Sequence, residues 1–349
     1  MWHPVQFFLD SIAALRLAVA KPTPQLGLRQ STRMLDETQL IQPKVLVDLL
    51  FDTGSGSLWV LDPSCAVDCP SSYNFTRPYF NPNASSTAQS ENLRETITYL
   101  GGFVGLGFRP LAQGNTSIYD TLFHPTYLPA HRIGIYLGNA PETTSNPSPQ
   151  TNGVVTFGGS EEDKYGAESL KWTDILPARS FQLYSHWIVP INGIKTTRHS
   201  ATGRNKTTFP SQTGAVAIFD TGAAHISVPQ SIIEEIFNTL GFNYTLISQG
   251  YRPPCSEVAK DNASLTLILG DVEITVTTND LSNPGYTADE YCWPPFIPWD
   301  SSDWLVGKVF LKSFYSVWDL GGWNVSEVGD GNPRIGFSYL KEEYQPRLV

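Results

Sequence analysis

Two copies of the triplet Asp-Thr-Gly carry the residues of this chain that are best suited to chemistry. One copy is Asp52-Thr53-Gly54 and the other is Asp220-Thr221-Gly222. If the two loops meet about a pseudo-two-fold axis, their carboxyl groups lie side by side, cannot both ionise and share one proton. One group then acts as base and the other as acid. Together they can activate a water molecule against a carbonyl carbon without a covalent intermediate.

The neighbours of each aspartate suit this role. Gly54 and Gly222 allow the backbone to turn tightly behind the carboxylates. The hydroxyls of Thr53 and Thr221 can hydrogen-bond across to the opposite loop and stiffen the pair. Ser55 is expected to hydrogen-bond the first aspartate and hold it ionised.

Each triplet also sits in the same local pattern, which makes the signal specific. An apolar run ends at each aspartate, and small residues and a second apolar run follow, as in residues 45–60 and 214–229. Each half then has two apolar residues and a glycine downstream, Phe103-Val104-Gly105 and Leu305-Val306-Gly307. A lone Asp-Thr-Gly is an ordinary turn. Two copies with these matched surroundings predict an internal repeat around one site.

The remaining patterns predict a fold made mainly of strands. Gly (28), Pro (26) and 12% aromatic residues are typical of β-rich chains with many turns. One helix is predicted from Pro229 to Leu240, where an apolar face ends at Gly241. The other expected elements are strands at 95–99, 101–108 and 333–340, a hairpin at 265–277, and either a strand with a short helix or paired strands at 304–319.

Bulk composition narrows the class of protein. A chain of 349 residues with 41% hydrophobic residues favours two globular lobes. The formal net charge of -10 argues against nucleic acid and anionic membrane surfaces as partners. Outside the N-terminus, no stretch of about 20 apolar residues predicts a membrane span.

Several features indicate the secretory pathway. The even number of cysteines fits two disulfides in an oxidising compartment, with free thiols or a zinc site as the alternatives. The cysteines are Cys65, Cys69, Cys255 and Cys292. Seven N-glycosylation sequons are expected at Asn74, Asn83, Asn115, Asn205, Asn243, Asn262 and Asn324. Residues 1–20 are interpreted as a signal peptide ending in Ala-Val-Ala, with an amphipathic surface helix as the alternative, and 21–42 as a leader or linker.

These motifs together resemble the pepsin-like aspartic protease family. FDTGSGSLWV and IFDTGAAHISVP resemble its two active-site loops, and FVG and LVG resemble the strands that thread them. CAVDC resembles the small disulfide loop after the first site, and RIGFSYL resembles the final strand. The resemblance covers roughly residues 42–340. It implies an all-β, bilobal fold with pseudo-two-fold symmetry, in which residues 43–178 form a shortened N-terminal lobe and 179–349 the C-terminal lobe.

The resemblance also assigns roles to individual residues. It implies an aspartic endopeptidase with catalytic Asp52 and Asp220 and disulfides Cys65–Cys69 and Cys255–Cys292. Trp59 would lie behind the flap over the active site, and Tyr99 would be the flap tyrosine that closes over substrate. We expect a monomer that acts on peptides or proteins, needs no cofactor or metal, and is secreted or vacuolar.

Two departures from the family pattern keep a second hypothesis open. GGFVG follows Tyr99 almost at once, where the family has roughly 40 further residues, so the flap is expected to be truncated. Ala223 stands where Ser or Thr is usual after the second triplet, which removes one hydrogen bond to Asp220. The alternative is therefore a catalytically impaired homologue that binds peptides or proteins without cutting them.

Overall fold

The computed structural model describes most of the chain from residue 46 onward and two short segments before it. The described residues are 5–10, 14–18, 46–60, 102–112, 117–122, 128, 130–138, 153–179, 183–200, 203–258, 263–282, 291–322 and 331–346. For residues 5–10, 14–18, 46–50, 59, 60, 102, 121, 122 and 200 the description is limited to the backbone.

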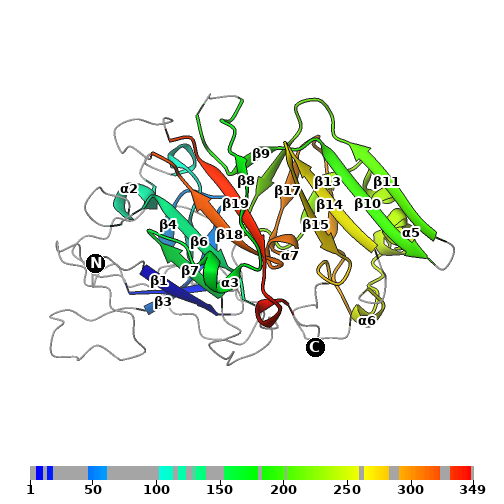
Figure 1. The fold of residues 1–349 in the computed structure, drawn as a ribbon, viewed down its shortest axis with the longest axis horizontal. Helices are drawn as coiled ribbons and strands as arrows, with labels where there is room; N and C mark the ends of the chain where they lie inside the picture. Colours follow the sequence, from blue (N-terminus) through cyan, green and yellow to red (C-terminus); the bar gives the residue numbers. More distant parts are fainter. Residues whose placement is uncertain are drawn as a thin grey trace, which may run out of the picture.

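Three sheets make up the described chain, which confirms the expected all-β class (Figure 1). The first has ten strands in the order β4 (Leu58–Val60), β5 (Gly102–Gly105), β3 (Leu46–Asp52), β2 (Ala14–Ala18), β1 (Val5–Asp10), β7 (Gly153–Phe157), β6 (Arg132–Tyr136), β18 (Phe314–Asp319), β19 (Arg334–Tyr339) and β8 (Lys171–Asp174). The second has the order β11 (Gly203–Pro210), β10 (Gly193–Ser200), β14 (Ala263–Leu269) and β15 (Val272–Thr277). The third has the order β16 (Phe296–Trp299), β13 (Ile226–Pro229), β17 (Trp304–Val306), β12 (Val216–Phe219) and β9 (Ile188–Pro190).

The helices of the described residues are short. They are η3 (Arg109–Leu111), α2 (Ile118–Leu122), α3 (Glu162–Tyr165), α4 (Ile233–Leu240), α5 (Tyr244–Ser248), α6 (Cys255–Val258), α7 (Lys308–Leu311) and η5 (Glu342–Tyr344). None of them is long and apolar enough to cross a membrane.

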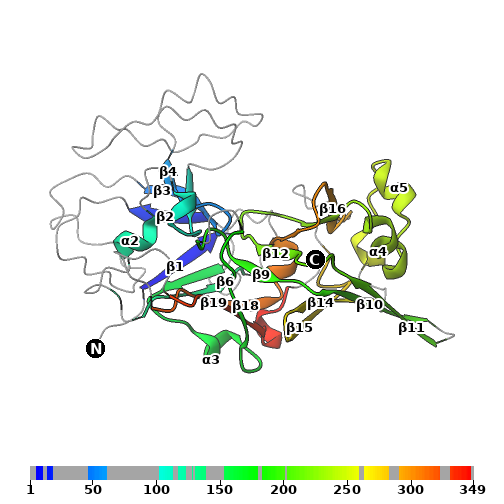
Figure 2. The same cartoon turned by 90° about the horizontal axis from the view of Figure 1, so that it is seen from above.

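The strands gather in two bodies that share the largest sheet. Early strands such as β1, β3, β6 and β7 lie on one side of the molecule and β10, β11 and β14 on the other, in both views (Figures 1 and 2). The late strand β18 pairs with β6, so the largest sheet takes strands from both halves of the chain. Strands β7 and β18 are buried along their whole length, as expected for the interior of a covered sheet.

Most of the local predictions are confirmed, and one helix boundary is wrong. The hairpin β14–β15, the closing strand β19 and the strand–helix–strand run β17–α7–β18 lie where the sequence indicated. The predicted helix begins at Ile233 rather than Pro229, because Pro229 is the last residue of β13 and is held in its pairing with Trp299. Helix α4 packs its buried face against β10 and β14 (Figure 2).

The structure of the N-terminal segment contradicts one of its two interpretations, the amphipathic surface helix. The backbones of β1 and β2 pair with each other and with β7 and β3, so an amphipathic surface helix is the wrong secondary structure there. The signal-peptide interpretation stays a prediction. The expected strand at 95–99 lies outside the described residues.

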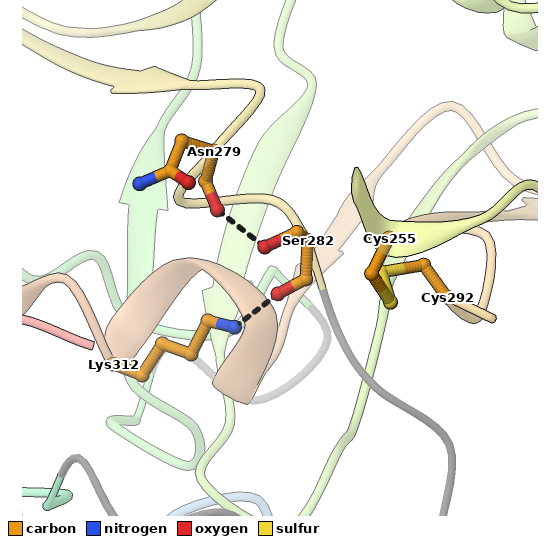
Figure 3. Close-up of a disulfide and its surroundings, with 5 residues drawn as sticks. All are labelled: Cys255, Asn279, Ser282, Cys292 and Lys312. Atoms are coloured by element: carbon orange, nitrogen blue, oxygen red, sulfur yellow. Dashed lines mark hydrogen bonds between the residues drawn. A yellow bond between two sulfur atoms is a disulfide. The ribbon is translucent and has the colours of Figure 1, made fainter. Parts of the chain in front are cut away.

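A disulfide joins Cys255, at the start of α6, to Cys292, with their Cα atoms 4.8 Å apart (Figure 3). This confirms the pairing that the family resemblance implied. Nearby, the Ser282 hydroxyl donates to the Asn279 carbonyl oxygen at 2.6 Å, and Lys312 Nζ donates to the Ser282 carbonyl oxygen at 2.5 Å (Figure 3). The disulfide and the lysine thus each fix one end of the connection between residues 282 and 292.

Candidate active site

Both aspartates stand at the carboxyl end of a strand that has a parallel neighbour. Asp52 ends β3, which runs parallel to β5, and its carbonyl oxygen accepts a hydrogen bond from Leu106 N at 2.6 Å. Asp220 follows β12, which runs parallel to β17, and its N–H donates to the Val306 carbonyl oxygen at 3.0 Å. The internal repeat predicted from the sequence therefore exists as two equivalent strand pairs.

The apolar-apolar-Gly segments pass through the loops that the two triplets form. Gly107 N donates to the Ser55 carbonyl oxygen at 2.6 Å, and Gly307 N donates to the His225 carbonyl oxygen at 3.0 Å. A Cβ atom on Gly105 would lie 2.5 Å from Ser57 N, too close for any side chain. Each loop is thus closed around a strand that must carry glycine where the backbones cross.

The two threonines join the loops through four buried hydrogen bonds. The Thr221 hydroxyl accepts from Thr53 N at 3.1 Å and donates to the Phe51 carbonyl oxygen at 2.8 Å. In return, the Thr53 hydroxyl accepts from Thr221 N at 2.9 Å and donates to the Phe219 carbonyl oxygen at 3.0 Å. These reciprocal bonds confirm that the threonine hydroxyls reach across to the opposite loop.

The carboxyl groups face each other across the glycines. Each carboxylate accepts from the N–H of its own glycine, Gly54 to Asp52 at 2.9 Å and Gly222 to Asp220 at 2.7 Å. A Cβ atom on Gly222 would lie 2.5 Å from Asp52 Oδ1 and 3.1 Å from Asp220 Oδ1. One on Gly54 would lie 2.5 Å from Asp220 Oδ2. Glycine is therefore required in both loops for the carboxyl groups to approach.

The environment of Asp220 favours its protonated form. Burial, the charge of Asp52 and a side-chain hydrogen bond with Asp52 raise the pKa of Asp220 to about 7, against the opposing effect of the Gly222 and Ala223 N–H groups. A carboxyl group that keeps its proton near neutral pH can donate that proton to a reacting group.

Among the other predicted site residues, one expected hydrogen bond is not formed and several residues lie outside the described part of the chain. Ser55 Oγ is buried and makes no hydrogen bond in the part of the chain that the structure describes, so the expected bond to Asp52 is not formed. The backbone of Trp59 lies in β4 opposite Phe103. Tyr99 and the cysteines Cys65 and Cys69 lie outside the described residues.

Two of the seven sequons can be placed. Asn205 is exposed on β11, the edge strand of its sheet, and Asn243 is exposed at the start of α5, where its Oδ1 accepts from Leu246 N at 3.2 Å. Both side chains are accessible on the surface. Asn74, Asn83, Asn115, Asn262 and Asn324 lie outside the described residues.

Two residues beside the site carried no signal in the sequence analysis. Trp187 is fully buried and its Nε1 donates to the Leu106 carbonyl oxygen at 2.7 Å. His186, next to it, is half-buried and interacts electrostatically with Asp52. Both belong to the segment that enters β9, far from either triplet in sequence, so no spacing rule could have singled them out.

Comparison with known proteins agrees with this geometry. A family model described as eukaryotic aspartyl protease matches residues 39–104 and 100–328. The chain belongs to this family. Mucorpepsin of Rhizomucor pusillus is 26% identical over 85% of this chain and 76% of its own length. Embryonic pepsinogen of Gallus gallus is 24% identical over 78% and 73%. Cathepsin E of Cavia porcellus is 24% identical over 78% and 75%.

Membership of the eukaryotic aspartyl protease family makes the chain an aspartic endopeptidase by class, with peptides or proteins as substrates. This confirms the reaction class that the sequence predicted.

Proposed function

We propose that Asp52 and Asp220 are the catalytic dyad of this aspartic endopeptidase. The observation that carries the proposal is the set of four threonine hydrogen bonds, which hold the two loops together so that each carboxylate lies against the glycine of the other loop. Side chains fixed in this way by their own backbone neighbours need little reorganisation during the reaction.

The roles of the two groups follow from their surroundings. Asp52 takes a proton from the attacking water, while protonated Asp220 donates a hydrogen bond, and then its proton, to the oxygen of the peptide carbonyl. The tetrahedral intermediate collapses when Asp52 passes the proton that it took from water to the leaving amine and Asp220 takes a proton from a hydroxyl of the intermediate, which restores the starting dyad. No covalent bond to the enzyme forms at any step.

The test is digestion of a denatured protein between about pH 3 and pH 6, with products identified by mass spectrometry and pepstatin as inhibitor. We expect pepstatin-sensitive cleavage by the wild type and none by Asp52→Asn or Asp220→Asn. The matched control is Asp271→Asn, which changes an exposed carboxylate at the β14–β15 turn. Equal cleavage by either dyad variant and the wild type would refute the assignment.

The alternative function is peptide or protein binding without cleavage. It rests on the short connection between Tyr99 and the strand β5, which leaves little chain for a flap. Under this alternative, the wild type would bind immobilised pepstatin at acid pH but would release no peptides in the digestion assay.

The cellular compartment and the partners of the enzyme are proposed from the chemistry of its residues. The disulfide Cys255–Cys292 and the exposed sequon residues Asn205 and Asn243 favour the secretory pathway, with export or vacuolar storage as the destination. The net charge of -10 disfavours nucleic acid as a partner, and we propose a monomer. A shift in electrophoretic mobility on treatment with an N-glycosidase would test the compartment.

A further inference from the structure

A half-buried histidine, His186, interacts electrostatically with one member of the dyad. His186 is flanked by Ser185 and Trp187, which are both buried. Phe108 N donates to the Ser185 carbonyl oxygen at 2.8 Å, and Trp187 Nε1 donates to that of Leu106 at 2.7 Å. Both neighbours are thus tied to the segment that follows β5.

That segment leads directly to the first aspartate. Leu106, which accepts from Trp187, also donates its N–H to the Asp52 carbonyl oxygen at 2.6 Å. On the other side, Phe219 N donates to the Trp187 carbonyl oxygen at 3.0 Å, one residue before Asp220. The chain around His186 is therefore bonded directly to β12 and, through Leu106, to the end of β3.

The charges around the imidazole can be named. Burial lowers the pKa of His186, and the carboxylate of Asp52 opposes that effect. On the packed segments, Tyr119 donates its hydroxyl to the Leu106 carbonyl oxygen, and Arg109 forms an ion pair with Asp120. The ring of Tyr184 packs on Phe108, and Ser185 Oγ lies 3.2 Å from His186 Nδ1. Asp220 is the other carboxyl group of the site.

We propose that His186 is a positioning residue that favours the ionised form of Asp52 under acid conditions. The proposal rests on the dyad assigned above. When the imidazole is protonated, its positive charge attracts the negative charge of Asp52 and opposes the uptake of a second proton by the dyad. The enzyme then keeps the singly protonated dyad that catalysis needs to a lower pH than it would without the histidine.

The acid side of the activity profile tests this directly. His186→Gln removes the charge, so we expect the midpoint of the acid limb of kcat/KM to rise by roughly 0.5 to 1 pH unit, as for two unit charges that interact in a partly solvated site. His186→Lys keeps a cation at the position and is expected to retain the wild-type limb. His199→Gln, an exposed histidine on β10, is the matched control and should leave the profile unchanged.

A second measurement does not depend on activity. Proton NMR follows the ring resonance of His186, assigned by its loss in His186→Gln, through a pH titration of the wild type and of Asp52→Asn. Removal of the carboxylate charge should lower the titration midpoint of His186. An unchanged midpoint in Asp52→Asn, or an acid limb that His186→Gln does not move, would overturn the inference and leave the dyad intact. If the wild type cuts nothing, the proposed function fails and the NMR titration alone decides the role of His186.

Discussion

The threonine hydrogen bonds between the loops make a quantitative prediction about stability. Thr221→Val replaces a hydroxyl by a methyl group of nearly the same size in a residue that is only 1% exposed. The substitution removes the acceptor of Thr53 N and the donor to the Phe51 carbonyl oxygen. Two backbone groups of the first loop are then buried without partners, while the shape of the side chain is kept.

The cost can be estimated group by group. A buried polar group left without a partner costs roughly 1 to 3 kcal/mol, so the two groups orphaned by Thr221→Val should together lower the free energy of unfolding by about 2 to 6 kcal/mol. For a chain of 349 residues, with an unfolding entropy of about 2.1 cal/mol/K per residue, that loss corresponds to a fall in Tm of roughly 3 to 8 °C. Thr53→Val breaks the other two bonds, to Thr221 N and the Phe219 carbonyl oxygen, and should cost a similar amount.

Calorimetry of five variants separates this cause from others. Thr221→Ser keeps the hydroxyl and should lose much less stability than Thr221→Val. Thr208→Val makes the same chemical change at an exposed position of β11 and should shift stability by about 0.5 kcal/mol or less. Because both threonines hold one loop pair, the double variant Thr53→Val/Thr221→Val should cost less than the sum of the single variants. Equal stability of the valine and serine variants at position 221 would refute the reasoning.

Three further predictions concern the loops, the shared proton and the disulfide. Gly222→Ala places a Cβ atom 2.5 Å from Asp52 Oδ1, so activity should fall by about 100-fold or more while the circular dichroism spectrum stays unchanged. Asp220 holds its proton to about pH 7 in the folded protein, well above the range of an unfolded carboxyl group, so it reduces stability as the pH rises from about 4 to about 7. The Tm of Asp220→Asn minus the Tm of the wild type should therefore increase as the pH rises across this window. A difference that stays constant would contradict the raised pKa. Replacement of Cys255 and Cys292 by Ala should cost about 2 to 4 kcal/mol of stability in denaturant titrations and leave the pH profile of cleavage in place.

The sequence predicted the parts of the site that repeat. Apolar runs before each Asp-Thr-Gly indicated strands, and the matched glycine segments indicated that each loop is threaded, which β3–β5 and β12–β17 confirm. The hydroxyl bonds of Thr53 and Thr221 could be predicted because side-chain oxygens near tight turns need partners, and the opposite loop is the nearest source.

The sequence could not predict features that depend on tertiary pairing. The apolar face of α4 was correct, but its start was not, because a parallel pairing with Trp299 holds Pro229 in β13 and overrides its preference for a helix N-terminus. Ser55 was expected to bond Asp52 on sequence proximity alone. Its hydroxyl direction depends on side-chain torsions that no sequence pattern specifies, and in the structure it bonds no described group.

In the mechanism that we propose, two identical triplets perform opposite tasks, so a feature other than the triplet sequence must distinguish them. The bonds within the dyad are nearly symmetric, since each aspartate accepts from its own glycine and each threonine serves the opposite loop. Symmetric bonds give neither carboxyl group a preference for the proton. The preference comes from the surroundings of Asp220, where burial, first, and the charge of Asp52 raise its pKa. We therefore expect the assignment of acid and base to follow the burial of each position rather than the triplet sequence, so exchange of the two loop sequences should leave the acid on the C-terminal side.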